Sequence, residues 1–177
     1  MRILITGGCG FIGISLIDLI LDSTDYKINV LDNMSVGNES NLKNLPNYDK
    51  DRVNIFNGDI REKDDVAEAI SNCSVVVNLA AQVGVIDSID DPYFDADVNI
   101  LGTLNLLESC RFNKIKKFIT ASSAAPLGDQ IPPVNENSVP APSSPYGASK
   151  LSSEAYCSAY SNSFNLPTIV LRFSNVY

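Results

Sequence analysis

Residues 6–13 read TGGCGFIG, and they lie between the first apolar run of the chain and an amphipathic segment. Gly8, Gly10 and Gly13 satisfy the pattern GxGxxG, and Gly7, Gly10 and Gly13 satisfy GxxGxxG. Glycines at this spacing allow a tight turn, a close approach of the backbone to a phosphate, and close packing of a helix on a strand. The stretch therefore predicts a strand, a phosphate-binding turn and a helix whose N-terminus faces an anion.

Outside this stretch, short apolar runs alternate with longer segments of helical periodicity, and no internal repeat is present. The alternation is typical of an α/β fold with a parallel sheet, and continuous apolar runs are typical of strands buried on both faces. The expected strands are 2–6, 27–31, 52–56, 74–80, 116–122 and 168–173, and the expected helices are 11–22, 62–71, 92–112 and 145–164. The polar segments 33–51 and 124–145 follow strand ends, where such folds carry binding loops.

An acidic residue, Asp32, ends the second expected strand. A carboxylate at this point is suited to accept hydrogen bonds from both hydroxyls of a ribose, and its charge would repel a 2'-phosphate. Together with the glycine turn, it predicts a site for NAD rather than NADP. The cofactor contacts expected in these two segments are Gly7, Gly10, Phe11, Ile12, Gly13, Asp32 and Asn33.

Composition and charge exclude several classes of function. The chain of 177 residues suits one domain, and it has a formal net charge of -8 and no histidine. An acidic chain without a basic face is not expected to bind nucleic acid. Without histidine, neither a histidine base nor a histidine-ligated metal is available, so acid-base chemistry falls to other side chains.

The cysteines and the hydropathy pattern indicate the cellular compartment in which the protein works. The four cysteines are scattered with no CxxC pair, which favours buried thiols in a reducing environment over disulfides or a zinc site. No apolar run is long enough to span a bilayer. We therefore expect a cytoplasmic protein with no metal site and no membrane partner.

The segment SSPYGASK, residues 143–150, places Tyr146 and Lys150 four positions apart at the start of an expected helix. This spacing puts both side chains on one helix face, about 5 to 6 Å apart at Cβ. Ionising a tyrosine at pH 7 costs about 4 kcal/mol, and a lysine cation at about 5 Å would offset about 3 kcal/mol of this at an effective dielectric constant of about 20. The pair is a candidate base with its electrostatic partner. Taken alone, the same motif also fits one aromatic and one charged residue on a helix surface.

Six motifs, taken in order, carry a resemblance to a known family: TGGCGFIG at 6–13, GDIRE at 58–62, LAAQ at 79–82, TASSAA at 120–125, YGASK at 146–150 and LRFSNVY at 171–177. With these motifs the chain resembles the extended short-chain dehydrogenases, and within them the NAD-dependent nucleotide-sugar epimerase/dehydratase family of the UDP-glucose 4-epimerase type. The resemblance covers essentially the whole chain. It implies a Rossmann-type, doubly wound parallel sheet with strand order 3-2-1-4-5-6 and helices on both faces.

The resemblance also implies roles for further cofactor-binding residues. Asp59 and Ile60 match a pair that contacts adenine, and Asn99 matches an asparagine near the cofactor, with a simple polar helix residue as the alternative. The residues that match the lining of the middle of the cofactor are Leu79, Ala80 and Ala81. Ordinary packing at a strand end is the other interpretation of this last group.

For catalysis the resemblance implies Ser123, Tyr146 and Lys150, with Ser122 as the competitor of Ser123. Ser123 would hydrogen-bond the sugar hydroxyl whose proton passes to Tyr146, while hydride passes from the same carbon to the nicotinamide. In an epimerase the 4-keto sugar then turns over and receives the hydride on its other face. Lys150 would also bind the nicotinamide ribose, and Asn175 matches a residue that touches the substrate.

Several positions depart from the family pattern. Related 4,6-dehydratases carry an Asp-Glu pair where this chain has Ala124 and Ala125, which favours an epimerase first and a simple reductase second. Pro126 and Leu127 replace the common Val-Tyr, and Asn78 replaces a common histidine. The expected substrate is a nucleotide sugar, with a UDP-hexose favoured.

The last departure is the end of the sequence within the motif at 171–177. We expect one NAD-binding domain over 1–177 that holds the catalytic residues, lacks the smaller substrate-binding domain, and is weak or inactive as an epimerase. A non-catalytic NAD-binding module is the alternative from another class. The final strand should leave an exposed apolar edge, and the family implies a homodimer through the helices at 92–112 and 145–164.

Overall fold

The computed structural model describes residues 1–176, and they form a six-stranded, wholly parallel sheet in the order β3-β2-β1-β4-β5-β6. The strands are β1 (Arg2–Thr6), β2 (Lys27–Asp32), β3 (Val53–Asn57), β4 (Val75–Asn78), β5 (Lys117–Ser123) and β6 (Thr168–Phe173). The predicted Rossmann-type order is confirmed. Strand order reverses beside β1, whose neighbours are β2 and β4, and in such sheets the binding crevice lies outside the carboxyl ends of the strands at this point.

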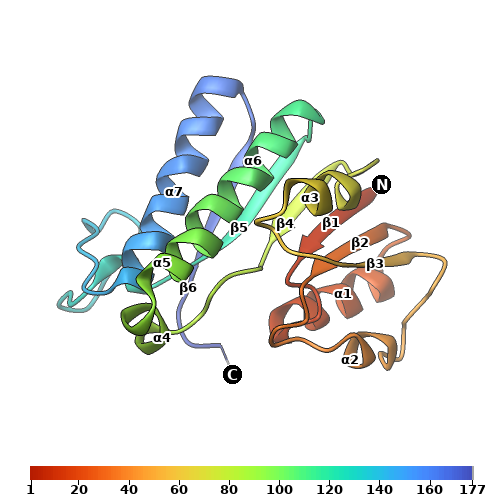
Figure 1. The fold of residues 1–177 in the computed structure, drawn as a ribbon, viewed down its shortest axis with the longest axis horizontal. Coiled ribbons are helices and arrows are strands. Elements are labelled where there is room, and N and C mark those ends of the chain that lie inside the picture. Colours follow the sequence, from red (N-terminus) through yellow and green to blue (C-terminus); the bar gives the residue numbers. More distant parts are fainter. Residues whose placement is uncertain (177) are drawn as a thin grey trace.

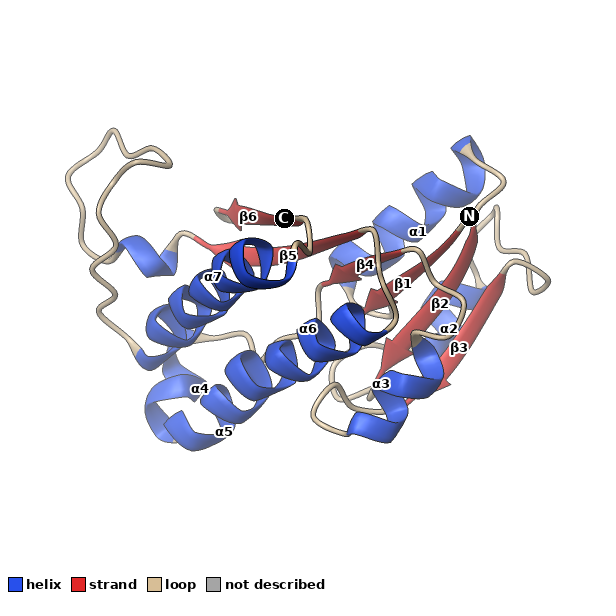
Figure 2. Ribbon diagram, turned by 90° about the horizontal axis from the view of Figure 1, so that it is seen from above, coloured by secondary structure: helices blue, strands red, loops and turns tan. Residues whose placement is uncertain are grey.

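Helices lie on both faces of the sheet (Figures 1 and 2). They are α1 (Phe11–Ser23), α2 (Glu39–Lys43), α3 (Lys63–Ala69), α4 (Val85–Asp90), α5 (Pro92–Ala96), the π-helix η1 (Asp97–Gly102), α6 (Thr103–Phe112), the 3-10 turn η2 (Ala125–Leu127) and α7 (Pro145–Phe164). α3, α6 and α7 cover one face with a core that includes Leu106 and Phe118. α1 and α2 cover the other face with a core that includes Ile17 and Leu42.

Burial along the strands differs between the two halves of the sheet. β1, β2 and β4 are buried almost throughout, as their continuous apolar runs predict. In β6, however, burial alternates, and Ile169 and Leu171 are 40% and 41% exposed. The expected exposed apolar edge is thus present, but the expectation that every strand is buried on both faces was wrong for both edge strands, β6 and β3. In β6 the face that α7 covers is partly buried, since α1 and α2 lie over the other half of the sheet (Figure 2).

The long helices follow from local sequence. α7 begins where predicted, because the Ser144 side chain accepts a hydrogen bond from the Gly147 N–H at 3.1 Å and Pro145 occupies the first turn. It ends at Asn165, which adopts the left-handed conformation with φ of 54°.

The predicted helix at 92–112 has the expected extent but not the expected regularity. Its centre, η1, is a π-helical insertion, a feature that is rare and is frequent at functional sites. Gly102 closes η1, and a Cβ there would lie 2.6 Å from the Ile60 side chain, so the helix can approach the end of β3 closely. The short helices α2, α4 and η2 were not predicted, because segments of three to six residues carry too little periodicity. No helix within residues 1–176 is long and apolar enough to cross a membrane.

Candidate active site

The glycine turn leads directly from β1 into α1 at the carboxyl edge of the sheet. Gly7 has φ of 65°, and a Cβ there would lie 2.7 Å from the backbone nitrogen of Ala80. A Cβ on Gly13 would lie 2.5 Å from the carbonyl oxygen of Gly7, so the first turn of α1 packs on the turn itself. A Cβ on Gly10 would meet only that same oxygen, at 3.3 Å. The outer side of the turn therefore lies open beside the start of α1, where Phe11 is 66% exposed and Ile12 is partly buried.

Asp32 fixes the end of β2 to this turn. Its side chain is 8% exposed, and its two carboxylate oxygens accept backbone hydrogen bonds from Cys9 and from Met34, each at 2.9 Å. Burial and the charge of Asp32 raise the pKa of the Cys9 thiol to about 12. Cys9 is thus an inert thiol at neutral pH. The hydrogen bond from Cys9 holds the glycine turn against the end of β2, so the Asp32 carboxylate lies beside the turn, where a ribose-binding carboxylate would be expected.

Beyond β3, Asp59 is held in a dense polar contact. The Nη2 and Nε atoms of Arg61 lie 2.9 Å and 3.0 Å from its two oxygens, and the Asn33 side chain donates to it at 2.9 Å. The hydrogen bond from Arg61 lowers the pKa of Asp59 to about 2. Ile60 beside it is 4% exposed, and Asn105 on α6 donates to the carbonyl oxygen of Ile60 at 3.2 Å.

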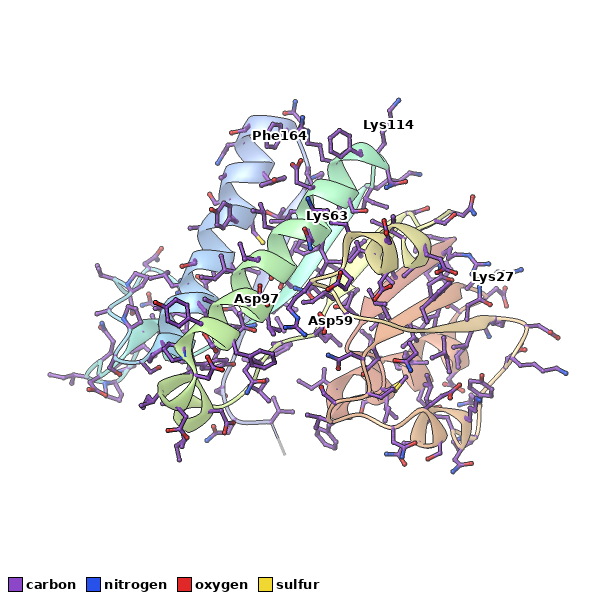
Figure 3. All side chains as sticks on the ribbon, in the orientation of Figure 1. Lys27, Asp59, Lys63, Asp97, Lys114 and Phe164 are labelled. Atoms are coloured by element: carbon purple, nitrogen blue, oxygen red, sulfur yellow. The ribbon has the colours of Figure 1, made fainter. Side chains whose placement is uncertain are left out.

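Arg61 extends this contact to the helix on the other side. Its guanidinium lies 5.1 Å from the centre of the Phe94 ring on α5, and it contacts Asp97 on η1 at 3.1 Å. Figure 3 labels Asp59 and Asp97, which Arg61 joins. The predicted adenine pair is therefore braced by a cation that the motif GDIRE contains but that the sequence analysis did not single out.

The middle of the crevice is formed by the chain leaving β4. The prediction extended this strand to Ala80, but the strand ends at Asn78. Leu79, Ala80 and Ala81 therefore lie in the segment that follows it. The N–H of Leu79 still donates to the carbonyl of Thr6 at 3.1 Å, and the Thr6 hydroxyl donates to Asn78 at 2.6 Å. Asn78 thus ties β1 to β4 from within the sheet.

Asn99, on the π-helical segment, is 2% exposed and its amide is used within the protein. Its oxygen accepts from the Gln82 N–H and its nitrogen donates to the Gln82 carbonyl, both at 3.0 Å. The nitrogen also approaches Asp95 at 3.0 Å and the Ser149 hydroxyl at 3.1 Å. Asn99 therefore holds the segment that follows β4 in place and joins it to α7. Its direct contact with a cofactor stays a prediction.

The two serines at the end of β5 have different surroundings. Ser122 is 6% exposed, and its hydroxyl donates to Glu154 on α7. Ser123 accepts a hydrogen bond from the N–H of Ala125 at 3.2 Å. Its hydroxyl also lies near enough to the Tyr146 phenol to lower the pKa of that group. This arrangement favours Ser123 over Ser122 as the partner of Tyr146.

Tyr146 lies in the first turn of α7, where its N–H donates to the Ser88 hydroxyl of α4 at 3.0 Å. Burial raises the pKa of its phenol, the Ser123 hydroxyl lowers it, and the charge of Asp95 raises it. Removal of the phenolate from water therefore dominates in this chain, and the expected lowering of this pKa by Lys150 stays a prediction.

Lys150 is the most strongly buried cation of the site, with 6% exposure. Burial lowers its pKa to about 8, against the charges of Asp95 and Glu154, which raise it. Within residues 1–176, no carboxylate forms an ion pair with its ammonium group. A buried ammonium without such a partner is suited to bind a hydroxyl or phosphate oxygen of a ligand.

Asp95 was not predicted from the sequence, and it is the most unusual carboxylate of this region. It is 1% exposed on α5, and within the described part of the chain its Oδ2 atom has no hydrogen-bond partner. Its sequence position, in a run of acids from 87 to 97, gave no signal that set it apart. Only the fold shows that its charge acts on Tyr146 and Lys150, raising the pKa of each.

Apart from Asn99, which lies within a helical segment, the predicted site residues therefore follow the carboxyl ends of parallel strands or lie in the first turns of the helices that begin there. Asn175 follows β6 and is exposed. The open side of the glycine turn, the buried carboxylate of Asp32 and the ammonium of Lys150 fit a dinucleotide. The fold and the site define a Rossmann-type domain with a serine, a tyrosine and a lysine gathered at its binding edge.

Comparison with known proteins agrees with this class. The chain belongs to the family whose model is described as GDP-mannose 4,6-dehydratase, which matches residues 4–177. It is 38% identical, over 99% of its length, to a putative UDP-glucose 4-epimerase of Methanocaldococcus jannaschii, and it covers 56% of that protein. The chain thus spans about half the length of such relatives. The predicted membership of the nucleotide-sugar epimerase/dehydratase family is confirmed.

Solved structures of an epimerase and of a dehydratase both resemble this chain. A UDP-glucose 4-epimerase from Thermus thermophilus in complex with NAD is 38% identical, with a TM-score of 0.89 over 100% of this chain and 56% of its own. A dTDP-glucose 4,6-dehydratase from Streptomyces venezuelae with NAD bound is 30% identical, with a TM-score of 0.90 over 97% of this chain and 55% of its own. The fold therefore does not separate epimerase from dehydratase.

The Asp59–Arg61 contact predicts how stability depends on acid. Because the folded pKa of Asp59 lies near 2 and the unfolded value near 3.9, its stabilisation is present above pH 4 and is lost as pH falls toward 2. We expect Asp59→Asn to remove at most about 2 kcal/mol at pH 6 and to flatten the acid side of the curve. Urea unfolding between pH 6 and 2 measures this, with the exposed Asp22→Asn as control. Parallel curves for wild type and Asp59→Asn would contradict the assignment.

Proposed function

We propose that the chain is the NAD-binding and catalytic part of a nucleotide-sugar epimerase, with a UDP-hexose 4-epimerase favoured. The observation that carries the proposal is that Ser123, at the end of β5, lies near Tyr146 in the first turn of α7, with the buried Lys150 one helical turn further on. The NAD and UDP-sugar named for solved relatives support the same ligands here.

Bound NAD would supply a hydride acceptor and later return the hydride. The residues of this chain provide the proton chemistry and the positioning. Tyr146 takes the proton of the sugar hydroxyl at its phenol oxygen, and Ser123 hydrogen-bonds the same hydroxyl. Lys150, as a buried cation, favours the phenolate in the closed complex, where the charge of the oxidised nicotinamide would add to its effect. Return of the hydride to the opposite face of the keto sugar would give the epimer, whereas return to the same face would regenerate the starting sugar.

The residues after Ser123 favour an epimerase over a dehydratase. Elimination of water needs an acid and a base near the sugar, and Ala124 and Ala125 offer neither. The backbone groups of these two alanines are also engaged within the fold. The Ala124 N–H donates to the carbonyl oxygen of Phe173 at 2.9 Å, and the carbonyl oxygen of Ala125 lies so close to Gly147 that a Cβ there would be 2.7 Å away. A reductase of the same superfamily is the second interpretation, and a non-catalytic NAD-binding module is the third.

The epimerase proposal predicts a specific loss in Tyr146→Phe. When the chain is incubated with NAD and UDP-galactose, UDP-glucose should form only at the weak rate expected for this chain, and Tyr146→Phe should lower that rate by about a hundredfold or more. Tyr156→Phe, on the same helix but away from Ser123, is the control. A 4-keto-6-deoxy sugar as product would indicate a dehydratase, and NAD binding without turnover of any sugar would favour the module.

The role of Asp32 predicts a preference between cofactors. Because its carboxylate would face a 2'-phosphate, we expect NADH to bind at least about tenfold more tightly than NADPH, a difference of about 1.4 kcal/mol. Calorimetric titration with both nucleotides measures this, and Asp32→Asn should narrow the gap. Equal affinities for wild type would refute the assigned role of Asp32.

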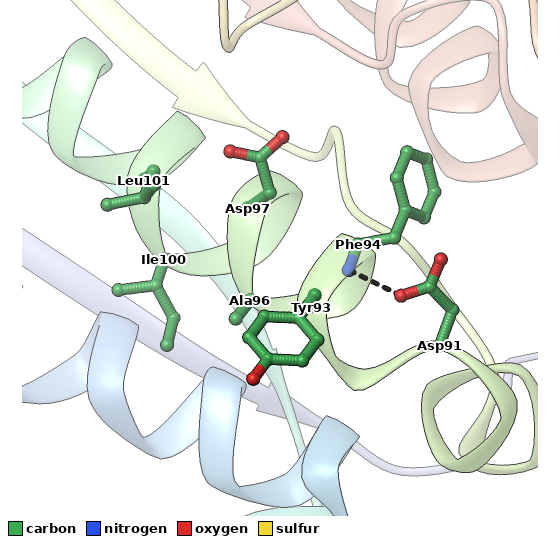
Figure 4. A pocket seen from close by; sticks show the side chains of 7 residues that line it. All are labelled: Asp91, Tyr93, Phe94, Ala96, Asp97, Ile100 and Leu101. Carbon is green, nitrogen blue, oxygen red and sulfur yellow. Dashed lines mark hydrogen bonds between the residues drawn. The ribbon is translucent and has the colours of Figure 1, made fainter.

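We further propose a homodimer through the outer faces of α5, η1, α6 and α7. Exposed apolar side chains gather there, with Tyr93 89%, Leu101 53% and Phe112 71% exposed. Figure 4 shows Tyr93 and Ile100 pointing toward α7 beside an apolar depression of about 560 Å³. Analytical ultracentrifugation of the chain should find a dimer that Leu101→Glu weakens. A monomer at about 100 μM would contradict this arrangement, since stable interfaces of standard size bind far more tightly.

The cytoplasmic location remains part of the proposal. It is supported by the four free cysteines, of which Cys9, Cys110 and Cys157 are buried, because free thiols persist in reducing compartments.

A further inference from the structure

Lys150 and Glu154 lie one turn apart on α7, and both belong to its inner side. A lysine and a glutamate at i and i+4 on a helix are neighbours and ordinarily attract each other. Here the Lys150 side chain is buried and that of Glu154 is 11% exposed, so little water screens the attraction. Nevertheless, within residues 1–176 the five ion pairs do not include this one.

The reason is that Glu154 is bound on its other side. The Nε atom of Arg172 on β6 lies 3.0 Å and 3.2 Å from its two oxygens, and Nη2 lies 2.7 Å from Oε2. The Ser122 hydroxyl of β5 donates to Oε1. Both carboxylate oxygens are thus occupied by groups from the last two strands, in the two-point geometry that arginine offers to a carboxylate.

Such a contact holds a carboxylate more firmly than a single lysine does. The guanidinium is planar and presents its donors as a rigid fork, whereas an ammonium is a point charge on a flexible stem. The Arg172 side chain is 23% exposed, so this pair is also partly removed from water. Lys150 consequently feels the charge of Glu154 only from a distance, as it feels that of Asp95.

We propose that Arg172 is a positioning residue for the lysine of the active site, because it holds Glu154 against the sheet and so keeps Lys150 free to face Tyr146 and a bound dinucleotide. Loss of the guanidinium would release Glu154 to pair with Lys150. The ammonium would then be drawn along α7 away from its ligands, and its charge would be compensated internally. The effect on catalysis rests on the proposed function, whereas the pairing of Glu154 with Arg172 rather than with Lys150 does not.

The arrangement can be tested without substrate or cofactor. The chain is labelled with lysine carrying ¹³C at Cε, the Lys150 signal is assigned from its loss in Lys150→Arg, and its titration is followed by NMR. Wild-type Lys150 should titrate near pH 8, at a pKa lowered by burial. In Arg172→Gln we expect this pKa to rise by about one unit or more, because a freed carboxylate at close range stabilises the ammonium.

The double variant Glu154→Gln with Arg172→Gln separates this proposal from a general loss of structure. Without the glutamate charge, the Lys150 pKa should return to the wild-type value or fall below it. Arg111→Gln, which removes the exposed pair with Glu108 on α6, is the matched control and should leave Lys150 unchanged. An unchanged pKa in folded Arg172→Gln would overturn the proposal, as would a rise that persists in the double variant.

If Arg172→Gln does not fold, Glu154→Gln alone decides the question. The account predicts a lower Lys150 pKa in that variant, and no change would overturn it. Where epimerase activity is measurable, Arg172→Gln should reduce kcat by tenfold or more, and the double variant should recover most of it. The expected NMR shifts in a chain that turns over no sugar would leave this proposal standing and reject the proposed function.

Discussion

The hydrogen bond from the Cys9 N–H to the carboxylate of Asp32 joins the two strands on which the binding edge depends. It exists because β1 and β2 are parallel and end together, so that the turn after one reaches the last residue of the other. Gly7 lets the same turn pass close to Ala80 after β4, and Gly13 lets α1 begin directly above it. β1, β2 and β4 thereby bring the backbone of the glycine turn, the carboxylate of Asp32 and the segment that begins with Leu79 to the same edge of the sheet.

At the other half of this edge, beside β5 and α7, the main feature is the buried charge of Lys150. Lys150 is surrounded by Asp95 and Glu154, and burial still lowers its pKa. Neither acid forms an ion pair with it among the described residues: Glu154 is bound by Arg172, and Asn99 donates to one oxygen of Asp95, whose other oxygen has no partner. The cost of a buried ammonium is thus left to be offset by a ligand.

Much of this fold could be predicted from sequence, because the apolar runs and the glycine turn act locally. The strand order came from the family resemblance, and the core strands and the ends of α7 followed from periodicity and capping. What could not be predicted depends on contacts between distant residues. The π-helical insertion ends at Gly102, which packs on Ile60 of a distant segment, and Asp95 is marked only by burial. The effect of burial on the pKa of Tyr146 could not be predicted, since helical spacing measures the distance to Lys150 but not the loss of water around the phenol.

The central claim is that one edge of the sheet binds a dinucleotide between the glycine turn and the tyrosine-lysine helix. A crystal structure of the chain grown with NAD tests it most directly. The account predicts the pyrophosphate at the start of α1, a ribose on the carboxylate of Asp32, and the nicotinamide ribose within hydrogen-bond distance of Lys150. A dinucleotide bound elsewhere on the protein, or one whose nicotinamide end lies away from Tyr146 and Lys150, would contradict it.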